Sequence, residues 1–180
     1  MPELPTILNR RTVARSRLFQ VEEVDLRFAN GAQRCFERLV SSSRGAVLIV
    51  PMLDADTVLM IREYAAGTHR YELALPKGLV EPGEDVLEAA NREIMEEVGY
   101  GARQLTPLTA LSIAPGYLGH VTHIILAQDL YPERRPGDEP EAIEVVPWRL
   151  GDLDSLISRD DCSEARSIAA LYLVRDRLKR

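Results

Sequence analysis

The sequence predicts an α/β (α+β) fold, in which helices cover both faces of a mixed β-sheet and a small antiparallel β unit comes first. Three observations predict it. Residues 19–40 have a hairpin pattern, a continuous apolar run typical of a buried strand begins at Ala46, and residues 78–100 and the C-terminus each indicate an amphipathic helix. We expect residues 1–44 to form the N-terminal antiparallel unit and residues 45–180 to form the main domain.

The strands are expected in the following order. From Val24 to Phe28 apolar and polar side chains alternate, and Asn30-Gly31 is a strong signal for a hairpin turn. Ser41-Ser42-Ser43 is expected to be a linker, and Asp54-Ala55-Asp56 a turn between two strands. The expected strands of the main domain cover residues 46–50, 58–61, 71–75, 108–113, 121–128 and 143–148.

The chain is expected to end in a helix. Residues 131–141 form a polar loop rich in proline, glycine and acids, and a strand follows it. Asp160 or Asp161 then provides a cap for an amphipathic helix that runs through Ala165 and Tyr172 to the C-terminus.

Length and composition limit the classes of function. With 180 residues, 46% of them hydrophobic, the chain suits one compact domain plus a modest extension. The net charge of −6 argues against a stable nucleic-acid partner, which requires a basic surface. Cys35 and Cys162 are expected to be reduced structural thiols. Because no segment resembles a signal peptide or a membrane span, we expect a cytoplasmic protein with no membrane partner.

The segment from Gly78 to Tyr100 is the most informative one. From Glu84 onward it carries six acids on one loop and helix, namely Glu84, Asp85, Glu88, Glu93, Glu96 and Glu97. The last three precede Gly99 at the end of the helix, where the macrodipole is already negative and like charges repel one another. A divalent cation is the simplest group that neutralises them.

The helical geometry agrees with a metal site. At about 100° per residue, Glu93, Glu96 and Glu97 fall within an arc of roughly 100° beside an apolar stripe. That stripe consists of Leu87, Ala90, Ile94 and Val98. One flank therefore packs on a core while the next presents oxygen ligands, which suit Mg²⁺ or Mn²⁺. The alternative is a solvated acidic face.

The same segment reads Gly78, five residues, Glu84, seven residues and then REIMEEVGY. It resembles the Nudix box, Gx5Ex7REUxEExGU, where U is a bulky aliphatic residue; Tyr100 at the last U is the one departure. The resemblance implies a Nudix α/β/α sandwich and a hydrolase of pyrophosphate bonds. It also implies Glu93 and Glu97 as principal metal ligands and Glu96 as an accessory ligand or water organiser.

The remaining positions of the box have structural roles by the same resemblance. A backbone carbonyl at Lys77 or Gly78 completes part of the metal shell, and Arg92 pairs with Glu84 or Glu96. Gly78 allows close approach of the backbone, and Gly99 provides a left-handed helix cap.

Segments outside the box narrow the substrate. Residues 5–31, 61–84 and 111–133 resemble the Nudix enzymes that hydrolyse ADP compounds, which implies ADP-ribose, NADH and short diadenosine polyphosphates as substrates, with release of AMP. Pro115, fifteen residues past Tyr100, falls at the marker proline of ADP-ribose hydrolases.

Some residues depart from the ADP-ribose hydrolase pattern. Where that pattern has RQYR, this chain has Arg62-Glu63-Tyr64-Ala65, so Arg62 is expected to grip a phosphate and Arg70 is a substitute for the missing arginine. Tyr64 stacks on adenine or packs against the protein. His120 stands where many relatives have a glutamate, which favours a broader range of ADP compounds.

The general base is expected on the loop before the last strand. Glu139 and Glu141 are candidates, and Glu141 matches best by position, two residues ahead of Ile143. His120 and Glu96 are alternatives. A solvated acidic loop is the competing interpretation for both loop residues.

The resemblance also implies a homodimer, in which the N-terminal unit exchanges between subunits and clasps the adenine. Two other functions are weighed against hydrolysis of ADP compounds. A hydrolase of nucleoside triphosphates or capped RNA is disfavoured by the N-terminal unit and Pro115. A non-catalytic sensor of ADP-ribose is disfavoured by the intact box.

Overall fold

The computed structural model of the protein describes residues 3–41 and 44–179. The chain divides into two units. The first comprises Met1–Ser43 and Ser112–His120, and the second comprises Arg44–Leu111 and Val121–Arg180. The first unit therefore includes residues 112–120, which the sequence-based boundary placed in the main domain.

The first unit contains an antiparallel sheet of three strands in the order β1-β2-β3. They are β1 (Thr6–Arg15), β2 (Gln20–Arg27) and β3 (Gln33–Leu39). The predicted hairpin is confirmed: Arg27 pairs with Gln33, and Gly31 in the turn has φ of 82°. Strand β1 was not predicted, because its residues are exposed throughout and lack a buried face. Of the predicted serine linker, Ser42 and Ser43 lie outside the described residues.

The second unit is built on two sheets, ordered β7-β4-β9-β8 and β10-β5-β6. Their strands are β4 (Ala46–Pro51), β5 (Thr57–Ala65), β6 (Arg70–Ala74), β7 (Lys77–Leu79), β8 (Tyr100–Ser112), β9 (Val121–Pro132) and β10 (Glu144–Arg149). Strand β4 runs parallel to β9 and antiparallel to β7, so the predicted mixed sheet is confirmed. All six strands predicted for this part of the chain overlap observed ones, although β8 and β9 are longer than expected.

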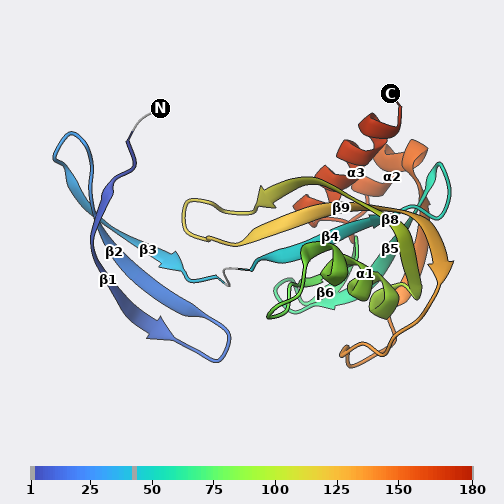
Figure 1. The fold of residues 1–180 in the computed structure, drawn as a ribbon, viewed down its shortest axis with the longest axis horizontal. Coiled ribbons are helices and arrows are strands. Elements are labelled where there is room, and N and C mark those ends of the chain that lie inside the picture. The colour runs from blue at the N-terminus through green and yellow to red at the C-terminus, as the bar shows by residue number, and fades with distance from the viewer. Residues whose placement is uncertain (1–2, 42–43, 180) are drawn as a thin grey trace. The chain divides into compact units, whose positions relative to one another are not determined.

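Helices cover both faces of the larger sheet. Helix α1 (Val86–Glu97) lies on one side, and α2 (Leu153–Ile157) and α3 (Ala165–Leu178) lie on the other, preceded by the short turn η1 (Leu150–Asp152) (Figure 1). Ile94 of α1 and Leu171 of α3 belong to two separate buried clusters, one on each side of β4. The predicted α/β/α arrangement is confirmed. No helix within residues 3–41 and 44–179 has the length and apolar character to cross a membrane.

The cap predicted for the last helix is wrong. The side chain of Glu164, and neither Asp160 nor Asp161, accepts hydrogen bonds from the backbone of Arg166 and Ser167 at 3.3 and 2.8 Å. Asp161 is held three residues upstream, because its carbonyl accepts a bond from the backbone N–H of Leu73 in β6. The backbone N–H of Ser163 also donates to Glu72 of β6, so the chain is tied to the sheet just before Glu164 caps the helix.

Candidate active site

Local rules fix where α1 begins and ends. The Asp85 carboxylate accepts the backbone N–H of Leu87 at 2.8 Å, and the Glu88 carboxylate accepts that of Asp85 at 3.2 Å, which completes a capping box. At the other end, Gly99 adopts φ of 82° and its N–H bonds to the carbonyl of Ile94 at 3.0 Å. With both ends set, the glutamates of the last turns point in fixed directions.

Two of those glutamates are buried. Glu93 is 8% exposed and Glu97 only 2%, because α1 packs its apolar side, including Ile94, against the sheet and these side chains lie at the margin of that contact. Burial raises the pKa of Glu97 to about 9, and burial also raises the pKa of Glu93. Two carboxylates are therefore held where ionisation is costly unless positive charge is supplied.

Arg92 gathers three acids of the box around one guanidinium. It binds Glu84 through two bonds of 2.8 and 3.0 Å, Glu93 at 2.7 Å and Glu96 at 3.1 Å. A further bond of 3.0 Å reaches the carbonyl of Leu79 in β7. Arg92 thus bonds to both of the acids expected as alternative partners, Glu84 and Glu96, and Glu93 is an additional partner. The guanidinium ties the helix to the loop before it.

The backbone of β7 lies against the buried acids. The N–H of Lys77 donates to Glu97 at 3.0 Å, and a Cβ atom at Gly78 would lie only 1.9 Å from Oε1 of Glu93. The structure thus brings the backbone at Lys77 and Gly78 next to both predicted principal ligands. The predicted need for a glycine at position 78 is explained by this close approach, since any side chain would displace the carboxylate.

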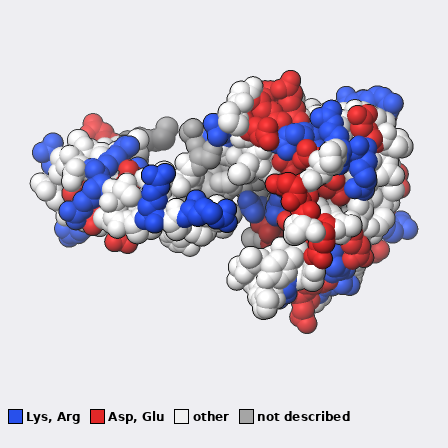
Figure 2. All heavy atoms as spheres, turned by 90° about the horizontal axis from the view of Figure 1, so that it is seen from below, with Lys and Arg blue, Asp and Glu red and all other residues white. Residues whose placement is uncertain are grey.

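A cleft of about 540 Å³ opens over these groups. Glu93, Glu96 and Glu97 all line it, together with Gly78 and Glu139. In Figure 2 acidic side chains crowd the visible face of the second unit, with basic ones between them. The cleft is therefore an acidic hollow floored by buried carboxylates, whose hard oxygen donors fit a divalent cation such as Mg²⁺ or Mn²⁺.

The two loop candidates for the general base occupy different positions. Glu139 lines the cleft of the three box glutamates, and its charge is among those that raise the pKa of Glu93. Its carboxylate folds back over Gly137, where a Cβ atom would lie 2.4 Å from Oε2. Glu141 lines neighbouring hollows instead and accepts a hydrogen bond from the hydroxyl of Tyr71 at 2.6 Å. The geometry favours Glu139, whereas position in the sequence favoured Glu141.

The arginines predicted to grip phosphate are engaged with acids of the protein. Arg62 forms ion pairs with Glu144 and Asp161. Arg70 bonds Glu72 at 2.6 Å and the hydroxyl of Ser163 at 2.8 Å. Arg62 lines a small hollow that shares Glu63 and Glu139 with the acidic cleft, whereas Arg70 is not among the residues lining that hollow.

The other predicted substrate residues are spread over both units. Tyr64 lines the same hollow as Arg62, and its hydroxyl pairs with Nδ1 of His69 at 2.7 Å. Pro115 and His120 belong to the first unit. Their substrate contacts stay predictions.

Sequence reasoning missed an ion pair in the cleft. The Glu63 carboxylate and the Lys77 ammonium lie 2.7 Å apart there. Strand alternation could have found Glu63. Leu59 and Ile61 belong to the buried cluster under α1, so Glu63, two positions further along β5, continues the same face.

Comparisons with known proteins bear on this site. A model of the NUDIX domain matches residues 42–171, and a model described as the NudE-type Nudix hydrolase N-terminal domain matches residues 5–38. The chain belongs to the Nudix hydrolase family. The Nudix box predicted from the sequence is therefore the segment that forms β7, the following loop and α1.

Individual relatives agree with the Nudix assignment over nearly the full length. The chain is 55% identical to the ADP compounds hydrolase NudE of Escherichia coli (strain K12), over 97% of this chain and 94% of the relative. It is 29% identical to the ADP-ribose pyrophosphatase of Bacillus subtilis (strain 168), over 91% of each. A crystal structure of an ADP compounds hydrolase superposes with a TM-score of 0.92 at 54% identity, covering 99% of this chain and 96% of that one. The predicted Nudix fold and enzyme class are confirmed.

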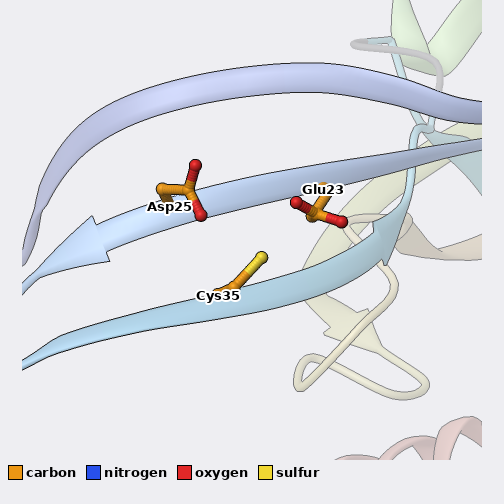
Figure 3. A group of neighbouring side chains, drawn as sticks. All are labelled: Glu23, Asp25 and Cys35. Carbon is orange, nitrogen blue, oxygen red and sulfur yellow. The ribbon is translucent and has the colours of Figure 1, made fainter.

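A second group of potential ligands lies in the first unit. Glu23, Asp25 and Cys35 approach one another on β2 and β3, with ligand atoms within 4.8 Å (Figure 3). A hydrogen bond to Glu23 is the main cause that raises the pKa of the Cys35 thiol to about 12, so the thiolate that binds metals is disfavoured. Glu23 also pairs with Arg11. We interpret the group as a cross-strand hydrogen-bonding cluster.

Proposed function

We propose that this Nudix hydrolase cleaves the pyrophosphate bond of ADP-containing compounds, with ADP-ribose, NADH and short diadenosine polyphosphates as substrates and AMP as a product. The observation that carries the proposal is the complete box, folded so that Glu93, Glu96 and Glu97 line one cleft. The 55% identity with an enzyme named ADP compounds hydrolase supports the substrate class.

The proposed cofactor is Mg²⁺, with Mn²⁺ as a substitute. Glu93 and Glu97 would hold it, with Glu96 and a backbone carbonyl at Lys77 or Gly78 as additional donors. When bound, such a cation neutralises diphosphate charge and favours attack at phosphorus. Burial of Glu93 and Glu97 supports this role, because it raises the pKa of both carboxyl groups and a bound cation would favour their ionised forms.

Protein groups would then position the reactants. Arg92 holds Glu93 and Glu96 in place through its bonds to both. Glu139 is the proposed acceptor of a proton from the attacking water, since it lines the same cleft as the box glutamates. Glu141 is the second candidate for this role, favoured by its position in the sequence.

We also propose that the enzyme works as a homodimer in the cytoplasm. Among the described residues of the first unit, Val24 alone is buried. Apolar side chains such as Leu8, Val13, Phe19 and Phe36 are 43–57% exposed. A three-stranded sheet with so little core requires a covering surface. A second copy of the chain would supply it and would place the N-terminal unit over the adenine. A monomer in light scattering at micromolar concentration would reject the dimer.

Release of AMP tests the proposed function. ADP-ribose, NADH and diadenosine triphosphate are each incubated with the protein and Mg²⁺. A nucleoside triphosphate and a capped RNA are assayed separately, as substrates of the alternative hydrolase. We expect AMP from the ADP compounds and none after chelation of the metal. Faster turnover of the triphosphate or the cap would favour the alternative hydrolase. Ligand binding without turnover by the parent protein would favour the sensor.

A further inference from the structure

The loop that carries Glu139 joins β9 to β10 through residues 133–143, and the structure anchors its first part on α1. The backbone N–H of Glu133 bonds to the carbonyl of Gly99 at 3.1 Å, and that of Arg135 bonds to Met95 at 3.0 Å. The guanidinium of Arg134 lies over Gly99, where a Cβ atom would be 2.7 Å from its nearest nitrogen. The end of the Nudix helix and the start of this loop are thus one contiguous structure.

The second part of the loop is anchored on a different element. The Tyr71 hydroxyl, on β6, donates to Oε1 of Glu141 at 2.6 Å, seventy residues away in sequence. Glu139, two residues before Glu141, lines the cleft of the box glutamates, whereas Glu141 is absent from its lining. The loop therefore presents one acid to the cleft and uses another to bond to the neighbouring sheet.

We propose that the Tyr71–Glu141 hydrogen bond is a latch that holds Glu139 in position over the metal-binding glutamates. Tyr71 and Glu141 are then positioning residues, and the inference rests on the proposed function of the cleft. The bond is charge-assisted, which makes it stronger than a bond between neutral groups. It also raises the pKa of Tyr71, as expected for a hydroxyl that donates to a carboxylate.

The alternative is that Glu141 acts directly as the general base. The two roles predict different effects of a glutamine at position 141. A latch requires an acceptor at position 141, so glutamine, whose neutral amide oxygen still accepts a weaker hydrogen bond, retains part of the latch. A base requires a group that takes up a proton, which an amide does not. A latch also makes the effects of changing Tyr71 and Glu141 non-additive, because either change removes the same bond.

The test compares Tyr71→Phe, Glu141→Ala, Glu141→Gln and the Tyr71→Phe/Glu141→Ala double variant in the full-length protein with Mg²⁺ and ADP-ribose. Tyr172→Phe is the matched control, since it removes another tyrosine-to-carboxylate bond, to Asp154 at 3.3 Å, between α3 and α2. We expect kcat to fall about fivefold in Tyr71→Phe and in Glu141→Ala, as loss of one such bond implies, with KM within about twofold of the parent. The double variant should be no slower than either, and the fall in kcat should be smaller in Glu141→Gln than in Glu141→Ala.

Hydrogen exchange provides a readout that does not depend on turnover. The peptide that spans residues 133–143 should exchange faster in Tyr71→Phe and Glu141→Ala than in the parent, and Tyr172→Phe should leave it unchanged. Unchanged exchange in Tyr71→Phe overturns the latch. So does a fall in kcat of about a hundredfold or more in Glu141→Gln, the size typical of a lost general base. A parent that releases no AMP but shows the exchange pattern would reject the proposed function and leave the latch standing.

Discussion

The carboxylate of Glu93 lies directly against the backbone of Gly78, so that a Cβ atom at position 78 would fall 1.9 Å from Oε1 and 2.0 Å from Cδ. The strand β7 and the Nudix helix approach one another here without any space between them. Because Gly78 has no side chain, the backbone of β7 can contact the carboxylate of Glu93, a predicted metal ligand.

Replacing Gly78 with alanine should displace Glu93 and reduce kcat/KM by at least about tenfold, the cost of about 1.4 kcal/mol in transition-state stabilisation. The measurement is AMP release from ADP-ribose with Mg²⁺. Gly151→Ala is the control, because nothing lies within 4 Å of a Cβ atom there. Equal activity of Gly78→Ala and the parent would show that catalysis does not depend on the position of the Glu93 carboxylate.

Replacing Glu97 with glutamine should stabilise the metal-free protein and weaken its binding of Mg²⁺. Glu97 is 2% exposed, and a neutral amide costs less to bury than a carboxylate. We expect the metal-free variant to be more stable than the metal-free parent at pH 8, by roughly 1–3 kcal/mol. Urea unfolding with a chelator measures this difference. The stabilisation that Mg²⁺ confers on the parent should be absent in the variant; an undiminished Mg²⁺ effect would contradict the assigned role.

Replacing Arg92 with lysine should destabilise the protein, because lysine cannot reproduce a forked contact with Glu84 and the bonds to Glu93 and Glu96. These groups are largely buried, so we expect a loss of about 1–3 kcal/mol in the free energy of unfolding. Arg103→Lys is the control. Its ion pair with Asp129 is more than half exposed on both sides, and such pairs contribute little. Similar losses in the two variants would count against a special role for Arg92.

The pH dependence of stability should reflect Asp161. Its hydrogen bonds with Arg159 and Arg62 lower its pKa below the ordinary 3.8. A lowered folded-state pKa gives a stabilisation that is fully present above the unfolded pKa and is lost as the pH falls toward the folded one. Asp161→Asn should therefore unfold at lower urea than the parent at pH 7, and the difference should shrink below about pH 4. Asp176→Asn, at a pair in which Asp176 is 63% exposed, should differ little from the parent at either pH.

Much of the site could be predicted because it follows local rules. The spacing of Glu93, Glu96 and Glu97 on a helix fixes their common flank, and Gly99 fixes where that helix ends. The continuous apolar run from Ala46 likewise placed β4, and the turn signal at residues 54–56 placed the boundary before β5. Such features depend on residues that are close together in the sequence, so the spacing of residue types is enough to predict them.

The features that could not be predicted depend on distant parts of the chain. The partner of Glu141 is Tyr71, and the partners of Arg62 are Glu144 and Asp161, so none of these bonds leaves a local pattern. The choice of Glu139 over Glu141 as the residue in the cleft depends on how an irregular loop turns. Strand β1 was missed because exposed strands have no apolar face to signal them.

Calorimetric titration with Mn²⁺ in the presence of a non-hydrolysable ADP-ribose analogue tests the central claim most directly. The titration compares the parent with the Glu93→Gln/Glu97→Gln variant, whose fold is checked by circular dichroism. We predict saturable Mn²⁺ binding by the parent and at least a hundredfold weaker binding by the variant, a difference of about 2.7 kcal/mol. Equal affinity of the two folded proteins for Mn²⁺ would contradict the account.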